Sequence, residues 1–435
     1  MSRTVLLKPT GTGSGKIGQG KSGRGKYRPK HPWLFAVAAV PVLACVVRYA
    51  TVPARPHGAA AREVWMQDAY VWQRQWTPAV ARAIDDSAAG VHAWHVLAAE
   101  LDRTGQWRDS RVEAGPLPLS GRPVIAVFRM DGQLADADVL ARHVATRVDA
   151  WARQGWQVAG VEIDHDCATS RLSDYGRFLD RLRQAMGGRH ALWITALPTW
   201  MDAPVLPDVL SRADEVVLQV HAVQDPRLGL FNAARAMRWM AQFARLSPRP
   251  WHVALPAYGS RVIWGADGGI SAVESETPAM MGDAPGHDEL VADPADVARF
   301  MTAAEDAPPR GFAGWVWFRL PTGDDRRAWS PGTWRAVMAH RPLTYAMRTR
   351  ALRDAPGLYD IVVENTGDID AAPPGMIRVD GACRGAGGRG GYGLEYDARG
   401  PWLRRRERML LAPGVPLLAG WVRCDGQGPD VHAAP

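Results

Sequence analysis

Three carboxylates stand at every second position of the segment GVEIDHD, residues 160–166. Side chains two residues apart lie on the same face of a β-strand, so Glu162, Asp164 and Asp166 are expected to point in one direction. Acids on a buried face are costly unless they are paired or take part in chemistry. Cleavage of a glycosidic bond would use such groups, because an acid must protonate the leaving oxygen. Asp166, the last of the three, is the first candidate for that acid.

The same reaction usually needs a second carboxylate as base or nucleophile, and the sequence does not single one out. Asp131, in the segment FRMDG, and Asp164 are the candidates, and Glu162 completes the acidic set. His221 is a candidate base, or a hydrogen-bonding group for a sugar hydroxyl. The alternative is a structural network, in which side chains such as Arg129 pair with the acids and no chemistry follows.

Eight strand-like runs alternate with segments whose apolar residues recur at helical spacing. This alternation predicts an α/β fold, a parallel (β/α)8 barrel over residues 62–345. A doubly wound open sheet is the alternative, but no GxGxxG segment follows the first strand. The expected strands are 69–76, 91–97, 123–130, 158–166, 190–197, 215–223, 250–258 and 312–320. The expected helices include 78–87, 136–154, 173–186 and 232–246.

In such a barrel the functional residues lie at the carboxyl ends of the strands. The expected strand ends collect aromatic, amide and charged side chains, a combination typical of a carbohydrate pocket, since indole rings stack on sugar rings. The chain has 19 Trp, and for any single Trp core packing is an equal alternative. The predicted substrate-binding residues are Trp72, Gln73, Trp94, Arg129, Trp200, Gln219, Tyr258, Trp315, Trp317 and Arg319.

The segment AGVEIDHD resembles the strand-four motif of family-18 chitinases and related lysozyme-like barrels, DGxDxDxE. In this resemblance Glu162 and Asp164 take the places of the two Asp of DxD, and Asp166 takes that of the terminal Glu, the proton donor there. GWVWFRL, residues 314–320, is similar to the strand-eight segment whose Trp floors the sugar subsite. LQVHAV, residues 218–223, departs from the family's Met-x-Tyr-Asp, which argues against substrate-assisted chemistry on an N-acetyl group.

Over roughly residues 69–343 the chain more closely resembles an uncharacterised bacterial family, the domain of unknown function 3142. Its strand-four pattern IDxDxxTSRL is matched by residues 163–172, and its LQVH and WFRLP segments are matched by 218–221 and 317–321. The resemblance implies a barrel and no known reaction.

The positive charge of the chain lies in its first 32 residues, which hold eight Lys or Arg and no acid. The other residues carry 44 basic and 45 acidic side chains, so a basic tail explains the net charge of +7 and no nucleic-acid partner is expected. The apolar run at 33–54 fits a signal anchor or the apolar part of a signal peptide. We therefore expect an inner-membrane-anchored protein with a periplasmic or extracellular body.

Beyond the expected barrel, residues 355–435 alternate like strands and predict a small β-rich domain. Its Cys383 and Cys424 could pair in an oxidising compartment. Residues 259–293 form a long, Gly- and acid-rich connection after the seventh strand, which predicts a lid or a small hairpin insertion.

The sequence has no CxxC segment and no metal-binding Cys/His spacing, so no metal or other cofactor is expected. Taken together, the residues predict an extracytoplasmic barrel that acts on a carbohydrate or polysaccharide with Asp166 as general acid. A polysaccharide-binding barrel without activity and a structural cell-envelope protein are the alternatives.

Overall fold

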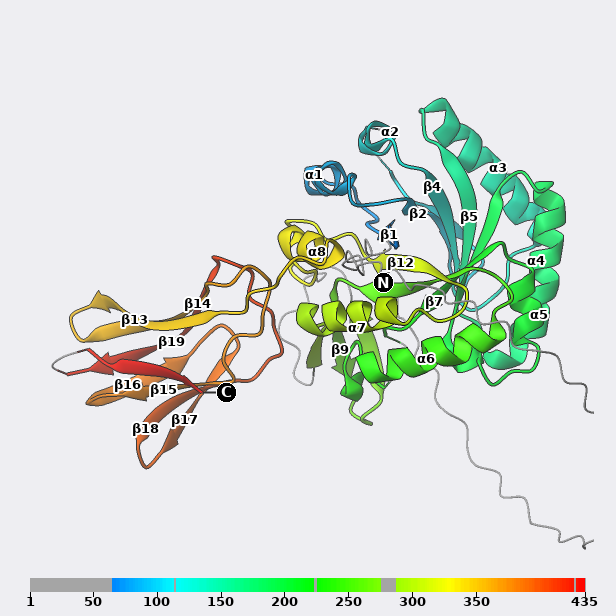
Figure 1. Cartoon of the computed structure of the whole chain (residues 1–435). Helices are drawn as coiled ribbons and strands as arrows, with labels where there is room; N and C mark the ends of the chain where they lie inside the picture. Colours follow the sequence, from blue (N-terminus) through cyan, green and yellow to red (C-terminus); the bar gives the residue numbers. More distant parts are fainter. Residues whose placement is uncertain (1–64, 113–114, 223–224, 275–286, 426–427, 435) are drawn as a thin grey trace, which may run out of the picture. The chain divides into compact units, whose positions relative to one another are not determined.

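The structure is a computed structural model that describes residues 65–112, 115–222, 225–274, 287–425 and 428–434. Eight parallel strands form a closed barrel, because β1 pairs with β12 on one side and with β2 on the other (Figure 1). The predicted eight-stranded barrel is therefore confirmed. Its strands are β1 (Met66–Val71), β2 (Trp94–Leu101), β4 (Val124–Met130), β5 (Val158–His165), β6 (Ala191–Ala196), β7 (Glu215–Gln219), β8 (Trp251–Pro256) and β12 (Phe312–Phe318).

Helices follow the barrel strands and lie on the outside of the barrel, as α3 and α4 do beside β4 and β5 in Figure 1. Several start at side-chain caps: Asp136, Asn232, Asp293 and Ser330 each accept a hydrogen bond from a backbone N–H of the first turn. The helices are α1 (Pro78–Ser87), α2 (Pro116–Ser120), α3 (Ala137–Arg153), α4 (Leu172–Met186), α5 (Leu206–Ser211), α6 (Ala233–Leu246), α7 (Pro294–Asp306) and α8 (Pro331–Met338). Short 3-10 turns are η1 (Thr169–Arg171), η2 (Pro198–Trp200) and η3 (Pro226–Leu228), and β3 (Trp107–Asp109) pairs antiparallel with β2.

Alternation along the strands divides their side chains between two cores. On β5, Val161 and Ile163 belong to the large core under the helices, whereas Glu162 and Asp164 take the opposite face, toward the barrel interior. Gly160 precedes them because a Cβ there would lie 3.0 Å from Ile125 Cδ1 and 3.1 Å from the carbonyl oxygen of Ala191. The strand-four acids are thus held inside the barrel, as their spacing predicts.

Three antiparallel strands follow β8, namely β9 (Gly259–Trp264), β10 (Ile270–Glu274) and β11 (His287–Val291). They form a sheet in the order β10–β9–β11, so the long connection after the seventh strand contains a small β-insertion.

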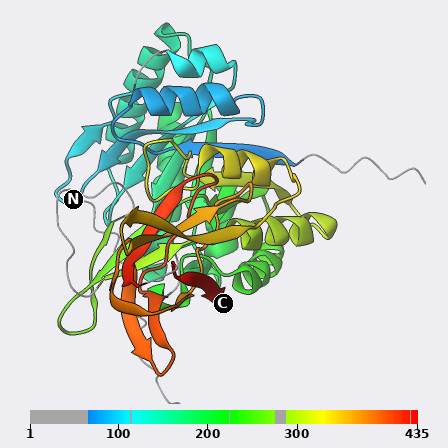
Figure 2. The ribbon, with the colours of Figure 1, turned by 90° about the vertical axis from the view of Figure 1, so that its left-hand side faces the viewer.

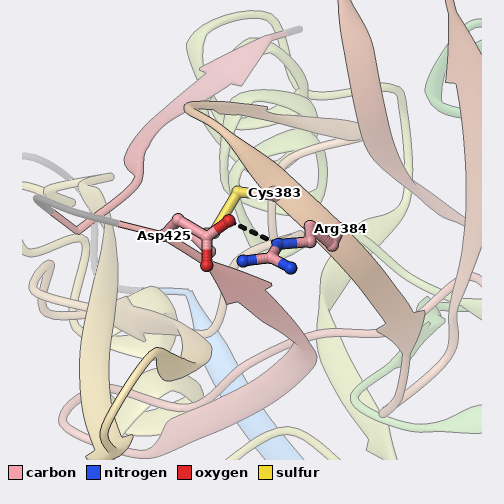
Figure 3. Close-up of a disulfide and its surroundings, with 4 residues drawn as sticks. Cys383, Arg384 and Asp425 are labelled. Carbon is pink, nitrogen blue, oxygen red and sulfur yellow. Dashed lines mark hydrogen bonds and ion pairs between the residues drawn. A yellow bond between two sulfur atoms is a disulfide. The ribbon is translucent and has the colours of Figure 1, made fainter.

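The region after the barrel consists of two four-stranded antiparallel sheets, coloured yellow to red in Figures 1 and 2, around a separate hydrophobic core. A disulfide joins Cys383 to Cys424 across β16 and β19, next to the exposed ion pair of Arg384 and Asp425 (Figure 3). The sheets are β13–β14–β19–β16 and β17–β18–β15–β20. Their strands are β13 (Met347–Ala355), β14 (Leu358–Asn365), β15 (Met376–Asp380), β16 (Cys383–Gly388), β17 (Tyr392–Asp397), β18 (Gly400–Arg405), β19 (Pro416–Cys424) and β20 (Asp430–Ala434).

The predicted basic tail, 1–32, and apolar segment, 33–54, lie outside the described residues. Within the described ranges, the helices are too short or too polar for any of them to cross a bilayer.

Candidate functional site

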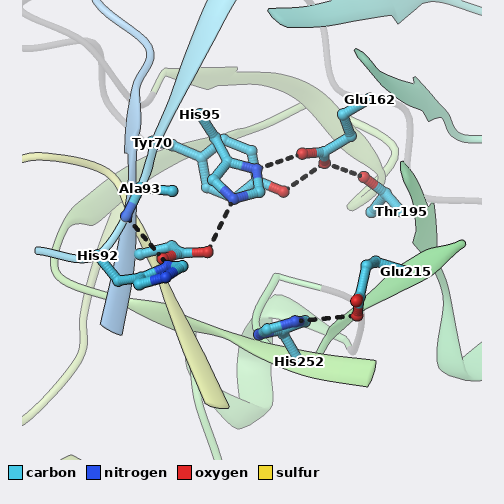
Figure 4. Close-up of polar contacts among 9 residues, drawn as sticks. Tyr70, His92, Ala93, His95, Glu162, Thr195, Glu215 and His252 are labelled. Atoms are coloured by element: carbon cyan, nitrogen blue, oxygen red, sulfur yellow. Dashed lines mark hydrogen bonds and ion pairs between the residues drawn. The ribbon is translucent and has the colours of Figure 1, made fainter. Parts of the chain in front are cut away.

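Glu162 is completely buried inside the barrel and contacts three polar side chains. Its carboxylate lies 2.5 Å from the Tyr70 hydroxyl, 2.5 Å from His95 Nδ1 and 3.0 Å from the Thr195 hydroxyl (Figure 4). Burial and the charge of Glu162 raise the pKa of Tyr70 well above its ordinary value, so the phenol keeps its proton and donates it in a hydrogen bond. Strands β1, β2 and β6 thus each supply one of the polar groups around the Glu162 carboxylate.

His95 lies between two carboxylates and is itself fully buried. Its Nδ1 faces Glu162, and its Nε2 lies 3.3 Å from Asp68 Oδ2. Burial lowers the pKa of His95, but the charge of Glu162 and the hydrogen bonds to both carboxylates outweigh this and raise it to about 9. Burial also opposes ionisation of Asp68, yet hydrogen bonds from His92 and His95 hold its pKa far below the ordinary value. At neutral pH the buried centre is therefore an imidazolium between two anions.

Asp164 and Asp166 lie beside the same guanidinium, that of Arg129 on β4. Arg129 Nη1 is 3.5 Å from Asp164 Oδ2, and Nη2 is 3.8 Å from Asp166 Oδ2. Burial raises the pKa of Asp164 to about 7; repulsion by Asp166 and Glu162 adds to this, and Arg129 opposes it. The side chain of Asp164 is 10% exposed, whereas that of Asp166 is 36% exposed. A buried carboxyl that keeps its proton near neutral pH thus adjoins a carboxylate that meets solvent.

Aromatic rings continue from this pair across the barrel interior. The Arg129 guanidinium lies 5.8 Å from the ring of Trp72, and Trp72 is 5.2 Å from the half-buried Phe318. Phe318 in turn stacks on His221 at 5.4 Å and contacts Tyr258 at 5.3 Å. The structure therefore brings five groups from β1, β4, β12 and the ends of β7 and β8 into continuous contact with the acids.

His221 lies two residues after β7 and is 3% exposed. Burial lowers its pKa to about 3, so the imidazole is neutral, and its Nδ1 lies 3.3 Å from the Tyr258 hydroxyl. Its Nε2 is buried and has no hydrogen-bond partner in the part of the chain that the structure describes. A base this weak is poorly matched to proton abstraction near neutral pH. Of the two roles predicted for His221, hydrogen bonding to a ligand is the one that the geometry favours.

Four predicted tryptophans lie on the other side of the barrel wall, which corrects the expectation that they line the mouth. Trp94, Trp200, Trp315 and Trp317 are all fully buried in the core between strands and helices. Each indole N–H also donates to a neighbour, in chain order to the Ser120 hydroxyl, the Cys167 carbonyl, the Glu305 carboxylate and the Gln67 side chain. These rings are therefore structural.

The remaining predicted residues are held by local contacts. Gln73 Nε2 donates to the Leu320 carbonyl at 2.8 Å, and Gln219 Nε2 donates to the His221 carbonyl at 3.1 Å. Arg319 is buried and forms an ion pair with Asp325. Asp131 forms an exposed ion pair with Arg103 at 3.1 Å, and its charge also acts on Arg129, the guanidinium beside Asp164 and Asp166. Its role as the second carboxylate stays a prediction.

Five residues of the site were not among the predicted ones: Asp68, Tyr70, His95, Thr195 and Phe318. All five occupy inward positions of barrel strands, and two-residue alternation counted from the start of each strand could have found them. Within the described residues, no group of three or more His, Cys, Asp or Glu side chains is placed to hold a metal ion.

Solved structures with a similar course of the chain include spore cortex-lytic enzymes and chitinases, and also xylanase and alpha-amylase inhibitor proteins. The spore cortex-lytic enzyme SleL of Bacillus megaterium QM B1551 has 12% identity and a TM-score of 0.49, over 64% of this chain and 75% of that one. A chitinase from Chromobacterium violaceum ATCC 12472 has 13% identity and a TM-score of 0.43, over 63% and 98%. Chitinase ChiA74 from Bacillus thuringiensis has 8% identity and a TM-score of 0.43, over 85% and 100%. No curated protein matches the chain.

Two family models match different parts of the chain. Residues 348–425, in the region of the C-terminal sheets, match a domain of unknown function, DUF8456. Residues 120–323, which span β4 to β12 and include Glu162, Asp164 and Asp166, match the domain of unknown function DUF3142. The resemblance that the strand-four motif predicted is thus confirmed, because the DUF3142 family model matches residues 120–323.

Proposed function

We propose that the barrel acts on a glycan in the manner of a glycoside hydrolase, with Asp166 as the general acid. The observation that carries the proposal is the placement of Asp164 and Asp166 on one guanidinium, next to an aromatic surface. Asp164 keeps a proton up to about pH 7 inside the barrel, while its neighbour reaches solvent. Two carboxyls whose environments differ in this way are typical of acid catalysis on glycosidic bonds.

The surrounding groups suit a sugar as the ligand. Phe318 is the half-buried member of the aromatic set and offers a ring face for stacking. His221 supplies a neutral imidazole whose Nε2 would bond a sugar hydroxyl, and Arg129 fixes both carboxyls. In this assignment Asp164 passes its proton to Asp166, which protonates the leaving oxygen as the glycosidic C–O bond breaks. Water then adds to the anomeric carbon and gives its proton to Asp164, which restores the starting state.

A polysaccharide-binding barrel without activity is the second candidate. The contacts of Glu162 and Asp131 favour it, because both carboxylates already have partners in the structure. Glu162 is saturated by Tyr70, His95 and Thr195, and Asp131 is paired with Arg103 at the surface. Only Asp164 then remains as base or nucleophile, and its raised pKa makes it a weak nucleophile below about pH 7.

The test compares the whole chain with its Asp166→Asn variant on a panel of bacterial polysaccharides, scoring both released reducing ends and binding. Loss of a general acid typically lowers the rate by about 100- to 10,000-fold. We expect a loss of that size in the variant, with binding retained. Asp180→Asn is the matched control, because Asp180 is an exposed aspartate on α4 that pairs with Arg212.

Binding by both proteins without release by either would favour the binding barrel. Release that Asp166→Asn leaves unchanged would remove Asp166 from the chemistry. Neither binding nor release on any glycan would leave the acids of β5 as part of the architecture.

We further propose that the body lies outside the cytoplasm, periplasmic or extracellular, and is attached to the inner membrane through residues 33–54. The disulfide of Cys383 and Cys424 supports this location, since disulfides persist in oxidising compartments. Fractionation of cells that express the whole chain tests it: we expect the protein in the membrane fraction and open to protease added outside, and recovery from the cytosol would contradict the proposal.

A further inference from the structure

Both ring nitrogens of His95 face oxygens that can only accept. Nδ1 lies 2.5 Å from Glu162 Oε2 and Nε2 lies 3.3 Å from Asp68 Oδ2 (Figure 4). An ionised carboxylate has no proton to offer, so a neutral imidazole would direct a lone pair at one of the two anions. The geometry therefore fits the imidazolium, which donates from both nitrogens.

Glu162 is held as the anion by its own contacts. Tyr70 and Thr195 donate to the carboxylate in addition to His95, so three donors from three strands surround it. Asp68 is held in the same way, because it also accepts from the backbone N–H of Ala93 at 2.9 Å. The His95 ring thus lies between two carboxylates, and each of them also accepts hydrogen bonds from other donors.

Asp164 is in a different position. It faces the carboxylates of Glu162 and Asp166, the guanidinium of Arg129 and the hydroxyl of Thr195. Arg129 is shared with Asp166, so one positive charge serves two acids. With Glu162 an anion two residues away, ionisation of Asp164 would add a further negative charge to the barrel interior, so Asp164 keeps its proton.

We propose that His95 is a positioning residue: by keeping Glu162 ionised, it makes Asp164 the carboxyl of β5 that carries the proton. The inference deepens the proposed function, because this proton is the one that Asp166 would draw on. The charge assignment itself involves no glycan, and it is measured without one.

Nitrogen-15 NMR of labelled histidines in the whole chain tests the first step, with His95→Gln used to assign the signal. We expect wild-type His95 to carry a proton on both nitrogens at pH 7 and to lose one near pH 9. A neutral His95 ring at pH 7 would overturn the proposal. The measurement is made on the wild-type protein, and the His95→Gln variant serves only to assign the signal.

Infrared difference spectra of the protonated-carboxyl band test the second step at pH 6. In the wild-type background we expect part of this band to be lost with Asp164→Asn and unchanged with Glu162→Gln. In the His95→Gln background we expect part of the band to be lost with Glu162→Gln and unchanged with Asp164→Asn. Without the imidazolium, Glu162 takes up a proton, and its charge no longer disfavours ionisation of Asp164. A band that still depends on Asp164 in that background would contradict the proposal.

His252→Gln is the matched control for these spectra. His252 is buried and packs on Trp193 as His95 does, with ring centroids 4.9 and 5.2 Å away, but its Nε2 faces Glu215. Its charge acts on Asp68 but it forms no hydrogen bond with Glu162 in the described structure, so His252→Gln should leave the dependence of the band on Asp164 intact. A confirmed charge assignment in a protein that cleaves no glycan would count against the proposed function alone, and cleavage with a neutral His95 would count against this inference alone.

Discussion

Neighbouring acids of β5 differ in what their surroundings allow them to do. Glu162 receives three hydrogen bonds, Asp164 is buried with a shared cation, and Asp166 meets solvent. The residue types alone do not distinguish them, since all three are carboxylic acids with similar ordinary pKa values. The difference arises from burial and from which side chains face them. It places the proton on Asp164, whose pKa of about 7 is close to the pH at which acid catalysis in a cell would operate.

His95 should make the stability of the barrel depend on pH. Its pKa is raised from 6.5 to about 9 in the folded protein, so its contribution is complete below pH 6.5 and is lost as the pH rises through about 9. From the size of the shift, the free energy of unfolding should fall by roughly 3 kcal/mol over this window. Urea unfolding at pH 6.5 and pH 9.5 measures the fall.

The control for this prediction compares the fall in the free energy of unfolding between the wild type and variants at single histidines. His92, whose pKa is also raised, titrates in the same direction, so part of the fall will remain in His95→Gln. His143→Gln should keep the full wild-type fall, because His143 on α3 pairs with Asp109 and not with Asp68 or Glu162 in the described structure. An equal fall in His95→Gln and the wild type would show that the imidazolium does not stabilise the folded barrel.

At the scale of elements, the sequence was informative about strands and less so about their faces. Six of the eight barrel strands begin within one residue of the predicted start, whereas β1 begins and ends before the expected 69–76 and β2 begins and ends after the expected 91–97. The face of β5 was assigned correctly because Val161 and Ile163 alternate with acids. On β12 the bulk of Trp315 and Trp317 misled the prediction. Helices α7 and α8 cover these rings, and the barrel interior receives Val316 and Phe318 instead.

The polar centre could not be predicted because it depends on how distant strands align. Tyr70 and His95 are 92 and 67 residues away from Glu162 in the sequence. They meet only because β1, β2, β4 and β5 pair in one particular register, in which Tyr70 lies opposite His95 and Val127 opposite Glu162. A shift of one residue in any pairing would turn these side chains to the other face. Single-sequence patterns specify that register weakly, so the acids were predicted and their partners were not.

At the scale of the whole molecule, the described residues form separate hydrophobic cores in the barrel and in the C-terminal sheets. One set fills the barrel interior and the space under its helices, and another lies between the two C-terminal sheets, around Ile361, Ile377 and Leu403. No residue is shared between these cores. Changes that loosen the C-terminal sheets should therefore leave the barrel strands protected.

The disulfide allows this independence to be tested. Cys383 and Cys424 are 41 residues apart and join β16 to β19 within one sheet, and a cross-link over a loop of that length stabilises by about 4 kcal/mol in the chain-entropy view. We expect the double variant Cys383→Ser, Cys424→Ser to speed hydrogen exchange in β13 to β20 and to leave β4 to β8 unchanged. Reductant should reproduce this in the wild type and have no effect on the variant. Exchange that accelerates equally in the barrel strands would show instead that the two cores unfold as one.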